Sequence, residues 1–303
     1  MRWCSPNALV RQAMQEHPGL TPPRHVANAL TMAKAKRKRG ETEETVRFLA
    51  TVMLGILILR SFIAAPFVIP SESMLPRLFV GDYLIVAKWP YGYSRWSLPW
   101  GLPLFPTVRW SMPARGDVVV FRSPDAPPGD TNPAHDDHDV IKRVVGLPGD
   151  TIQVRRGQVI LNGQAIPKQR IADFVLPITP NFTRCPPGHT EVLEGKPVCR
   201  YERYRETLPG GRSYVVLDTV PNADGDNTGL YSVPANSVFL MGDNRDNSAD
   251  SRFPFPTGMG YIPAERVEGR ALVTAFSTDG TASYWKPWTW FSAARPERIG
   301  EGF

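Results

Sequence analysis

The feature that most constrains the fold is an uncharged apolar run, FLATVMLGILIL, at residues 48–59. Extended between Arg47 and Ala65, it reaches the roughly 20 residues that an α-helix needs to cross the core of a bilayer. We therefore predict one transmembrane helix over residues 44–65. A buried helix of a soluble protein and a cleavable signal peptide are the alternatives, although bulky Phe62 and Ile63 before Ala64 and Ala65 make a poor cleavage site.

The distribution of charge predicts which way this helix crosses the membrane. Residues 1–40 hold eight Lys and Arg residues against one acid, whereas the whole chain has a formal net charge of +6. The remainder is thus nearly neutral, which argues against a nucleic-acid-binding body. A basic flank marks the cytoplasmic side of a membrane helix. We expect residues 1–43 to be a cytoplasmic tail and residues 66–303 to lie outside the cytoplasm.

The first 31 residues show no sustained periodicity and contain Pro18, Pro22 and Pro23. Met32 opens the basic cluster at residues 34–39, which is a more ordinary beginning for an anchored protein. We expect translation to start at Met32.

After residue 66 the pattern changes from helical to extended. Short apolar runs bounded by turn signals predict strands, and they lie at residues 83–87, 117–121, 140–145, 151–154, 159–161, 214–217, 237–240 and 271–275. Arg156-Gly157 and Asn162-Gly163 predict two tight hairpins. The fold class is therefore mainly β: an antiparallel-sheet body with an inserted β subdomain at residues 155–238, tethered by one N-terminal transmembrane helix.

Cysteine and tryptophan positions leave two questions open. Cys185 and Cys199 fall in a polar stretch outside the cytoplasm, where they can form a disulfide or remain two unpaired buried cysteines, while Cys4 should stay reduced. Residues 91–113 and 284–291 are rich in Trp, which suits either a membrane interface or an ordinary core.

Two polar residues in unusual settings suggest catalysis. Lys142 lies between Val140 and Val144 on one face of a predicted strand, and desolvation there lowers a lysine pKa toward neutrality. A neutral amine can take the proton of a serine hydroxyl. Ser73 follows Pro70 in a loop that could present a nucleophile, with Ser71 and the Ser73 N–H as donors for an oxyanion. Ordinary loop serines and an ion-paired lysine are the alternatives.

Together with a polar segment at 242–252, these residues resemble the bacterial type I signal peptidases, also called leader peptidases. The resemblance covers residues 42–303 and rests on PSESM (70–74), the stretch 81–88 with Tyr91-Gly92, RGDV (115–118), IKRVVGLPGD (141–150) and GDNRDNSADSR (242–252). It implies a serine endopeptidase with Ser73 as nucleophile, Lys142 as general base and Ser71 as an oxyanion donor. It further implies that Ser248 orients the lysine, that Asp250 and Arg252 support the site through a salt bridge, and that Asp243 pairs with Arg143.

The resemblance also implies a substrate. Family members remove signal peptides from exported preproteins, which bind as an extended strand with small residues at the first and third positions before the cut (Ala-x-Ala). The positions that match the pocket lining are Phe67, Ile69, Met74, Leu78 and Ile141. Expected partners are preproteins, membrane lipid and the protein-export channel, with no nucleic acid. The expected location is the bacterial inner membrane, single-pass, with a periplasmic or extracytoplasmic catalytic domain.

Other interpretations are weaker. Residues 135–139 (HDDHD) offer possible metal ligands, but they follow Pro133 in a polar loop, and we expect a solvated loop, no metal and no cofactor. Ser73 lacks a lysine three residues later, and no Gly-x-Ser-x-Gly elbow occurs. Self-cleaving repressor-type proteins and plasmid-transfer peptidases also pair a serine nucleophile with a lysine base, so they are the alternatives among enzymes. The alternative outside enzymes is a catalytically inactive, membrane-tethered β module.

Overall fold

The computed structural model describes residues 42–98, 101–125, 138–182, 184–283 and 285–303. The expected start at Met32, the basic cluster, Cys4 and residues 135–137 of the polar loop lie outside the described residues. Residues 58–303 form one compact unit, and the preceding segment is described separately.

The apolar run forms a helix over Thr42–Ile63, which ends in a π-helical turn, η1 (Leu59–Ile63). Within the described part of the chain it is the one helix long and apolar enough to cross a membrane. Its apolar side chains are exposed, which fits a membrane anchor and not a buried helix of a soluble protein. The helix ends at Ile63 and not at the predicted Ala65, because Ala64 and Ala65 already pair with β2.

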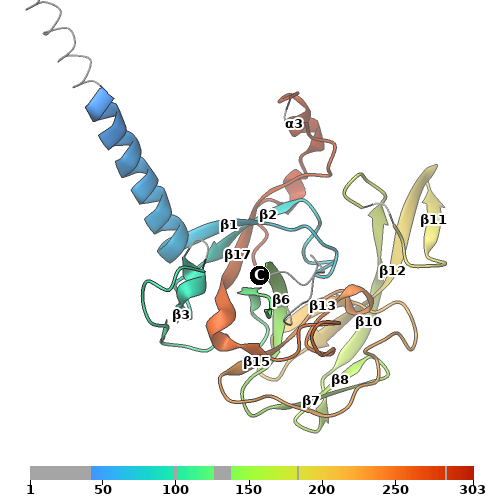
Figure 1. Ribbon diagram of the computed structural model, residues 1–303. Coiled ribbons are helices and arrows are strands. Elements are labelled where there is room, and N and C mark those ends of the chain that lie inside the picture. Colours follow the sequence, from blue (N-terminus) through green and yellow to red (C-terminus); the bar gives the residue numbers. More distant parts are fainter. Residues whose placement is uncertain (1–41, 99–100, 126–137, 183, 284) are drawn as a thin grey trace, which may run out of the picture. The chain divides into compact units, whose positions relative to one another are not determined.

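The rest of the chain is mainly β, as predicted (Figure 1). The strands are β1 (Ala64–Val68), β2 (Asp82–Ala87), β3 (Gly92–Tyr93), β4 (Val108–Arg109), β5 (Val118–Arg122), β6 (Asp139–Gly146), β7 (Thr151–Arg155), β8 (Gln158–Leu161), β9 (Gln164–Ala165), β10 (Lys168–Pro177), β11 (Thr190–Leu193), β12 (Lys196–Thr207), β13 (Ser213–Leu217), β14 (Tyr231–Ser232), β15 (Ser237–Met241), β16 (Ile262–Pro263) and β17 (Val267–Ser277). The short helices are η2 (Arg95–Ser97), η5 (Arg245–Asn247), η6 (Ala264–Arg266), α3 (Thr289–Ala293) and η7 (Pro296–Arg298).

The largest sheet has seven strands in the order β1-β2-β17-β5-β6-β15-β16, and each neighbouring pair is antiparallel. Three strands separate β1 from β6, yet Ile69, just after β1, and Ile141 of β6 belong to one buried cluster. The sheet therefore curls, which brings the segment after β1 against β6.

The inserted β segment leaves this sheet after Gly146 and returns at Ser237. It forms two four-stranded sheets, β10-β12-β11 with β13 on β12, and β14-β7-β8-β9. The predicted start at residue 155 is too late, because all of β7 already pairs within the insertion, and the predicted end at 238 falls inside β15. The insertion shares a core with the large sheet, since Val154 and Val159 pack in one buried cluster with Val145 of β6.

Both predicted hairpins are confirmed. Arg156 (φ 49°) and Gly157 (φ 73°) connect β7 to β8, and Asn162 (φ 52°) and Gly163 (φ 78°) connect β8 to β9. Positive φ at both central residues is the type I′ geometry that suits the twist of a two-residue hairpin.

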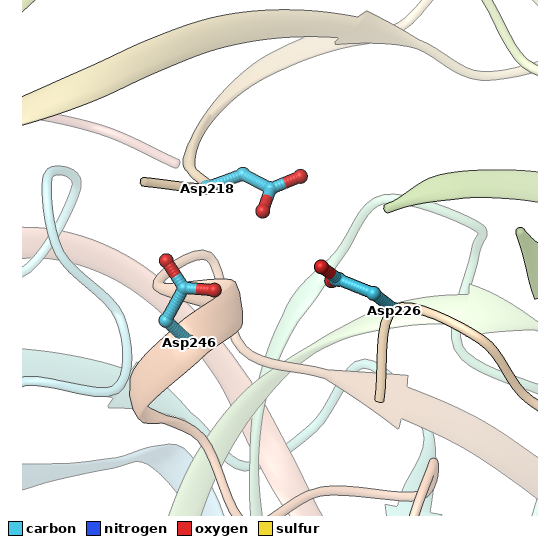
Figure 2. A group of neighbouring side chains, drawn as sticks. All are labelled: Asp218, Asp226 and Asp246. Carbon is cyan, nitrogen blue, oxygen red and sulfur yellow. The ribbon is translucent and has the colours of Figure 1, made fainter. Parts of the chain in front are cut away.

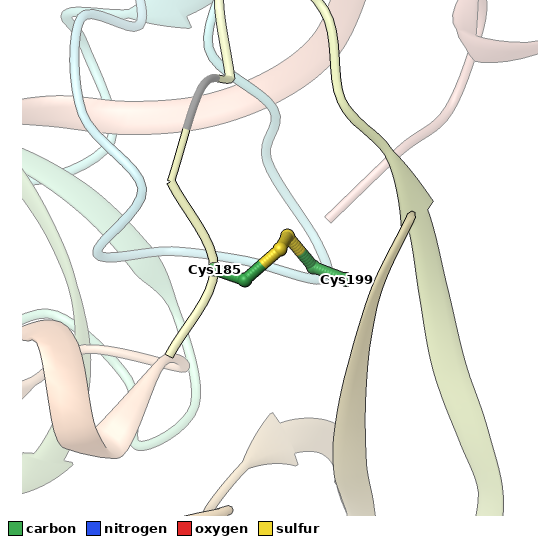
Figure 3. Close-up of a disulfide and its surroundings, with 2 residues drawn as sticks. All are labelled: Cys185 and Cys199. Atoms are coloured by element: carbon green, nitrogen blue, oxygen red, sulfur yellow. A yellow bond between two sulfur atoms is a disulfide. The ribbon is translucent and has the colours of Figure 1, made fainter. Parts of the chain in front are cut away.

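Cys185 and Cys199 form a disulfide (Figure 3). Of the two alternatives that the sequence left open, the structure therefore contains the bridge. Cys199 is fully buried in a cluster with Leu75 and Leu217, so the disulfide-bearing sheet packs against the turn that carries Ser73.

The two Trp-rich stretches differ. In the C-terminal stretch, Trp285 is 92% exposed and Phe291 is 88% exposed, so these side chains are not core residues. In the first stretch Trp110 is more than half exposed, whereas Tyr91 is buried and donates a hydrogen bond to Asp117.

Candidate active site

Ser73 lies in a tight turn directly after β1. The turn is fastened by the N–H of Leu75 to the carbonyl of Glu72 and by the N–H of Leu78 to the carbonyl of Met74. Met74, Leu75 and Leu78 are fully buried, because the apolar side chains that follow Ser73 enter the core. This anchoring fixes the serine backbone without a regular helix.

Lys142 reaches Ser73 from β6. Its Nζ donates a hydrogen bond of 2.7 Å to Ser73 Oγ and one of 3.0 Å to the carbonyl of Ile141. The lysine side chain is 4% exposed and Ser73 is also buried. The structure thus brings together two residues that lie 69 positions apart in the sequence.

Burial lowers the pKa of Lys142 to about 8, while the negative charges of Asp250 and Asp243 act in the opposite direction. An amine with this pKa is partly neutral near pH 8. A neutral amine in hydrogen-bond contact with a hydroxyl can act as a general base toward it. This pair is the part of the site with the clearest chemical capacity.

Ser71 lies beside the pair on the solvent side. Its Oγ is 3.4 Å from Ser73 Oγ, and the residue is exposed. The short separation of the two Oγ atoms means that both hydroxyls face the same space. A hydroxyl here could donate to an oxygen that becomes negative beside Ser73 Oγ.

Two buried ion pairs lie near Lys142: one joins β6 to the polar segment at 242–252, and the other lies within that segment. Arg143 donates to both carboxylate oxygens of Asp243, at 2.7 and 2.6 Å, and to the carbonyl of Gly116 at 2.9 Å. Arg252 binds both oxygens of Asp250, at 2.9 and 3.0 Å. Each buried charge therefore has a hydrogen-bonded partner, as burial requires.

Gly242 allows this segment to approach the turn that carries Ser73 closely. A Cβ atom at residue 242 would lie 2.6 Å from the carbonyl oxygen of Ser73 and 2.2 Å from Ser248 Oγ. The Gly242 N–H donates to Asp250 at 2.9 Å. Any larger residue here would push the segment away from Ser73.

Ser248 does not make the contact with Lys142 that the resemblance implies. Its Oγ is buried and has no hydrogen-bond partner among the described residues, and the hydrogen bonds of Lys142 go to Ser73 and Ile141 instead. The orienting role of Ser248 stays a prediction.

The sequence did not predict a set of hydrogen bonds, here called the clamp, that Asn244 and Asn247 make to the turn that carries Ser73. The N–H of Asn244 donates to the carbonyl of Ser73 at 3.0 Å, and its side-chain amide donates to the carbonyl of Glu72 at 3.1 Å. Asn247 donates to the Glu72 carboxylate at 3.1 Å. The density of amides in the 242–252 segment was the available signal, but it does not say which backbone groups they bind.

A second missed feature is the buried ion pair between Arg245 and Glu206. Arg245 binds both oxygens of Glu206, at 2.7 and 2.5 Å, and Tyr214 donates to the same carboxylate at 2.8 Å. Glu206 belongs to β12 of the insertion. Nothing in the sequence around Glu206 distinguishes it from the exposed charges of the same strand.

The five residues predicted to line the substrate pocket lie in one place. Ile69, Met74, Leu78 and Ile141 belong to a single buried cluster, and Phe67 packs against it. We call this group of residues the apolar floor. It lies next to Ser73 and Lys142, since Met74 and Ile141 are their chain neighbours.

Asp218, Asp226 and Asp246 gather near the insertion, with carboxylate oxygens within 4.8 Å of one another (Figure 2). They could offer ligands to a cation, but each already has a structural partner. Asp246 accepts from the N–H groups of Thr219 and Val220, Asp226 from that of Ala223, and Asp218 pairs with Lys168. The cluster is accounted for by loop hydrogen bonds and Lys168.

Comparisons with known proteins point to one family. The family described as signal peptidase, peptidase S26, matches residues 42–276. A signal peptidase I of Rickettsia typhi is 33% identical over 252 residues, covering 80% of this chain and 83% of its own length. One from Rickettsia prowazekii is 32% identical over 238 residues, covering 76% of this chain and 78% of its own length. A crystal structure of a signal peptidase I from Enterococcus faecalis covers 53% of this chain and 97% of its own at 21% identity, with a TM-score of 0.26.

Proposed function

Since the chain belongs to the signal peptidase family, peptidase S26, and is a serine endopeptidase of the signal peptidase I class, we propose that Ser73 is its nucleophile and Lys142 its general base. The observation that carries this proposal is the 2.7 Å contact between Lys142 Nζ and Ser73 Oγ in a buried setting. An inactive β module would need neither residue.

The proposed reaction has two stages. Neutral Lys142 takes the proton of Ser73 as Oγ forms a bond to the scissile carbonyl carbon, and the carbonyl oxygen becomes an oxyanion. When the C–N bond breaks, the lysine ammonium gives its proton to the leaving amine of the mature protein. Water then attacks the acyl-enzyme with Lys142 again as base, which releases the signal peptide as a carboxylate and restores Ser73.

Ser71 is the proposed side-chain donor to the oxyanion, together with the Ser73 N–H. The 3.4 Å separation of the two serine hydroxyls supports this role. Arg143 with Asp243 is a supporting pair that joins β6 to the 242–252 segment, and Arg252 with Asp250 is a supporting pair within that segment. Ser248 is a proposed orienting residue for Lys142, within the same segment.

We propose that the preprotein binds as an added strand along β1, an edge strand of the large sheet. Side chains at the first and third positions before the cut would then face the apolar floor of Phe67, Ile69, Met74, Leu78 and Ile141. Because these residues are mostly buried, little depth remains above them, which favours alanine at both positions.

The proposed partners are exported preproteins with signal peptides, the membrane lipid and the protein-export channel. Exposed Trp285, Trp288 and Phe291 support a lipid contact, because Trp favours the boundary between apolar and wet regions. The proposed location is the bacterial inner membrane, with one span, a cytoplasmic N-terminus and an extracytoplasmic catalytic domain.

The test of this function is cleavage of a preprotein with an Ala-x-Ala site by the full chain in detergent, with the cut mapped by mass. We expect one cut, after the second alanine. Replacing either alanine with leucine should abolish cleavage, whereas the same replacement at the intervening position should not. Cleavage at unrelated sites, or none by the folded enzyme, would contradict the proposal.

We predict that kcat/KM rises with pH through about 8. The base works only when unprotonated, and burial sets the pKa of Lys142 to about 8. The neutral fraction, and with it kcat/KM, should therefore be about 50-fold lower at pH 6 than at pH 8 and level off above about pH 9. The measurement is initial rates at low substrate, with tryptophan fluorescence at each pH as a control for unfolding. A flat profile from pH 5 to pH 9 would rule out Lys142 as the base.

A further inference from the structure

The inner face of the curled sheet is apolar at the apolar floor and carries charged side chains beyond it. Side chains two apart on a strand share a face. On β2 the buried Leu84 and Val86 are followed on that face by Lys88, and on β5 Val118 and Val120 are followed by Arg122. On β6, Asp139 precedes Ile141 on the same face. Because β2 and β5 run in one direction and β6 in the opposite one, the three charged residues lie at the same end of the sheet.

The charged residues at this end form a connected group. Lys88 Nζ lies 2.5 Å from Glu268 of β17, and Arg122 lies 2.6 Å from Asp139. We call Lys88, Arg122, Asp139 and Glu268 the charged layer. Burial raises the pKa of Glu268 to about 7, although the charge of Lys88 lowers it.

The charged layer lines a cavity of about 90 Å³ that continues the proposed substrate path. Ala65 and Phe67 of β1 line it as well, and they share a face with Ile69 of the apolar floor. Phe67 thus contacts both regions, and its ring lies 5.4 Å from Lys88 Nζ. A strand added along β1 would pass from the floor to this cavity without leaving the sheet.

We propose that this cavity is a subsite for the side chain of the fifth substrate residue before the cut, P5, and that it takes a side chain with hydrogen-bond acceptors. This inference rests on the proposed function. If the first and third residues, P1 and P3, face the floor, then P5 is the next residue on the same face, because strands alternate with a period of two. Two residues advance a strand by about 6.6 Å, the same step that separates successive inner-face positions of the enzyme.

The charges of the cavity decide which side chain it accepts. The lining of the cavity contains three cationic side chains, Arg60, Lys88 and Arg122, and two carboxyl groups, those of Asp139 and Glu268. Lys88 and Arg122 are paired, whereas exposed Arg60 has no ion-pair partner among the described residues. Arg60 is therefore available to an acceptor at P5, and a lysine at P5 would meet a like charge.

The experiment compares kcat/KM for preproteins that differ only at P5, with glutamate, glutamine, leucine or lysine, and the full-length enzyme. We expect glutamate and glutamine to exceed lysine by about five-fold, the range of a partly exposed charge interaction. Arg60→Glu should reverse the ratio of glutamate to lysine. Lys196→Glu makes the same change of charge at an exposed position of β12, and it should leave that ratio unchanged.

The outcomes separate this inference from the function on which it rests. Equal rates across the P5 series, with alanine at P1 still required, would overturn the subsite and leave the peptidase proposal intact. A glutamate preference that Arg60→Glu does not alter would also overturn it, since the cavity would then not be the cause. Absence of cleavage for every P5 variant would overturn both.

Discussion

Ser73→Ala is expected to lower kcat/KM for preprotein cleavage by at least about 10⁴-fold, because it removes the proposed nucleophile, Ser73 Oγ. Ser73 is buried and its Oγ contacts Lys142 Nζ and Ser71 Oγ. Alanine leaves the backbone hydrogen bonds of the turn in place, so the loss should be chemical and not structural. The measurement is cleavage by the full chain in detergent, quantified by mass.

Lys142→Met should cause a loss of similar size, since the chain length is close to that of lysine but no base remains. Residues that act as a unit are strongly non-additive, so the double variant should be about as slow as either single one. Ser232→Ala, at an exposed serine of β14, is the matched control and should keep full activity. Independent losses that multiply in the double variant would show that the two residues do not act together.

Glu206→Gln is expected to lower the free energy of unfolding by about 3–5 kcal/mol, because it leaves the Arg245 charge buried without a counter-charge. Glu206 is fully buried and binds Arg245 through both oxygens while accepting from Tyr214. Glutamine keeps the shape but cannot offer two anionic oxygens. Denaturant unfolding of the full chain in detergent, followed by tryptophan fluorescence, measures the change.

The same substitution at an exposed pair separates burial from charge. Glu191 binds Arg200 at 2.8 Å on the neighbouring strand, and both side chains are well exposed. Glu191→Gln should therefore leave the unfolding free energy nearly unchanged, since water already screens this pair. If both variants destabilised the protein equally, the buried pair would not be the special contribution that we assign to it.

Local patterns in the sequence were sufficient for part of the fold. Short apolar runs predicted β2, β5, β6, β7, β8, β13, β15 and β17, and Arg156-Gly157 and Asn162-Gly163 predicted the two hairpins that the structure contains. These signals are local because side-chain alternation and turn geometry depend on residues only two to four positions apart. The sequence patterns did not predict β1 or the long, more polar strands β10 and β12. The helix end at Ile63 and the start of the insertion were misjudged, because both depend on which strand pairs with which.

For the site, the sequence determined the chemical groups, and the tertiary structure decided their contacts. Ser73 and Lys142 could be selected from their unusual surroundings, with the family resemblance supplying their roles. Three features could not be predicted in this way: the clamp of Asn244 on the turn that carries Ser73, the pairing of Glu206 with Arg245, and the charged layer beyond the apolar floor. Each joins residues that are distant in sequence, and their contacts follow from the register and curl of the sheet. A hydrogen bond depends on separation in space, which the sequence pattern around either partner does not encode.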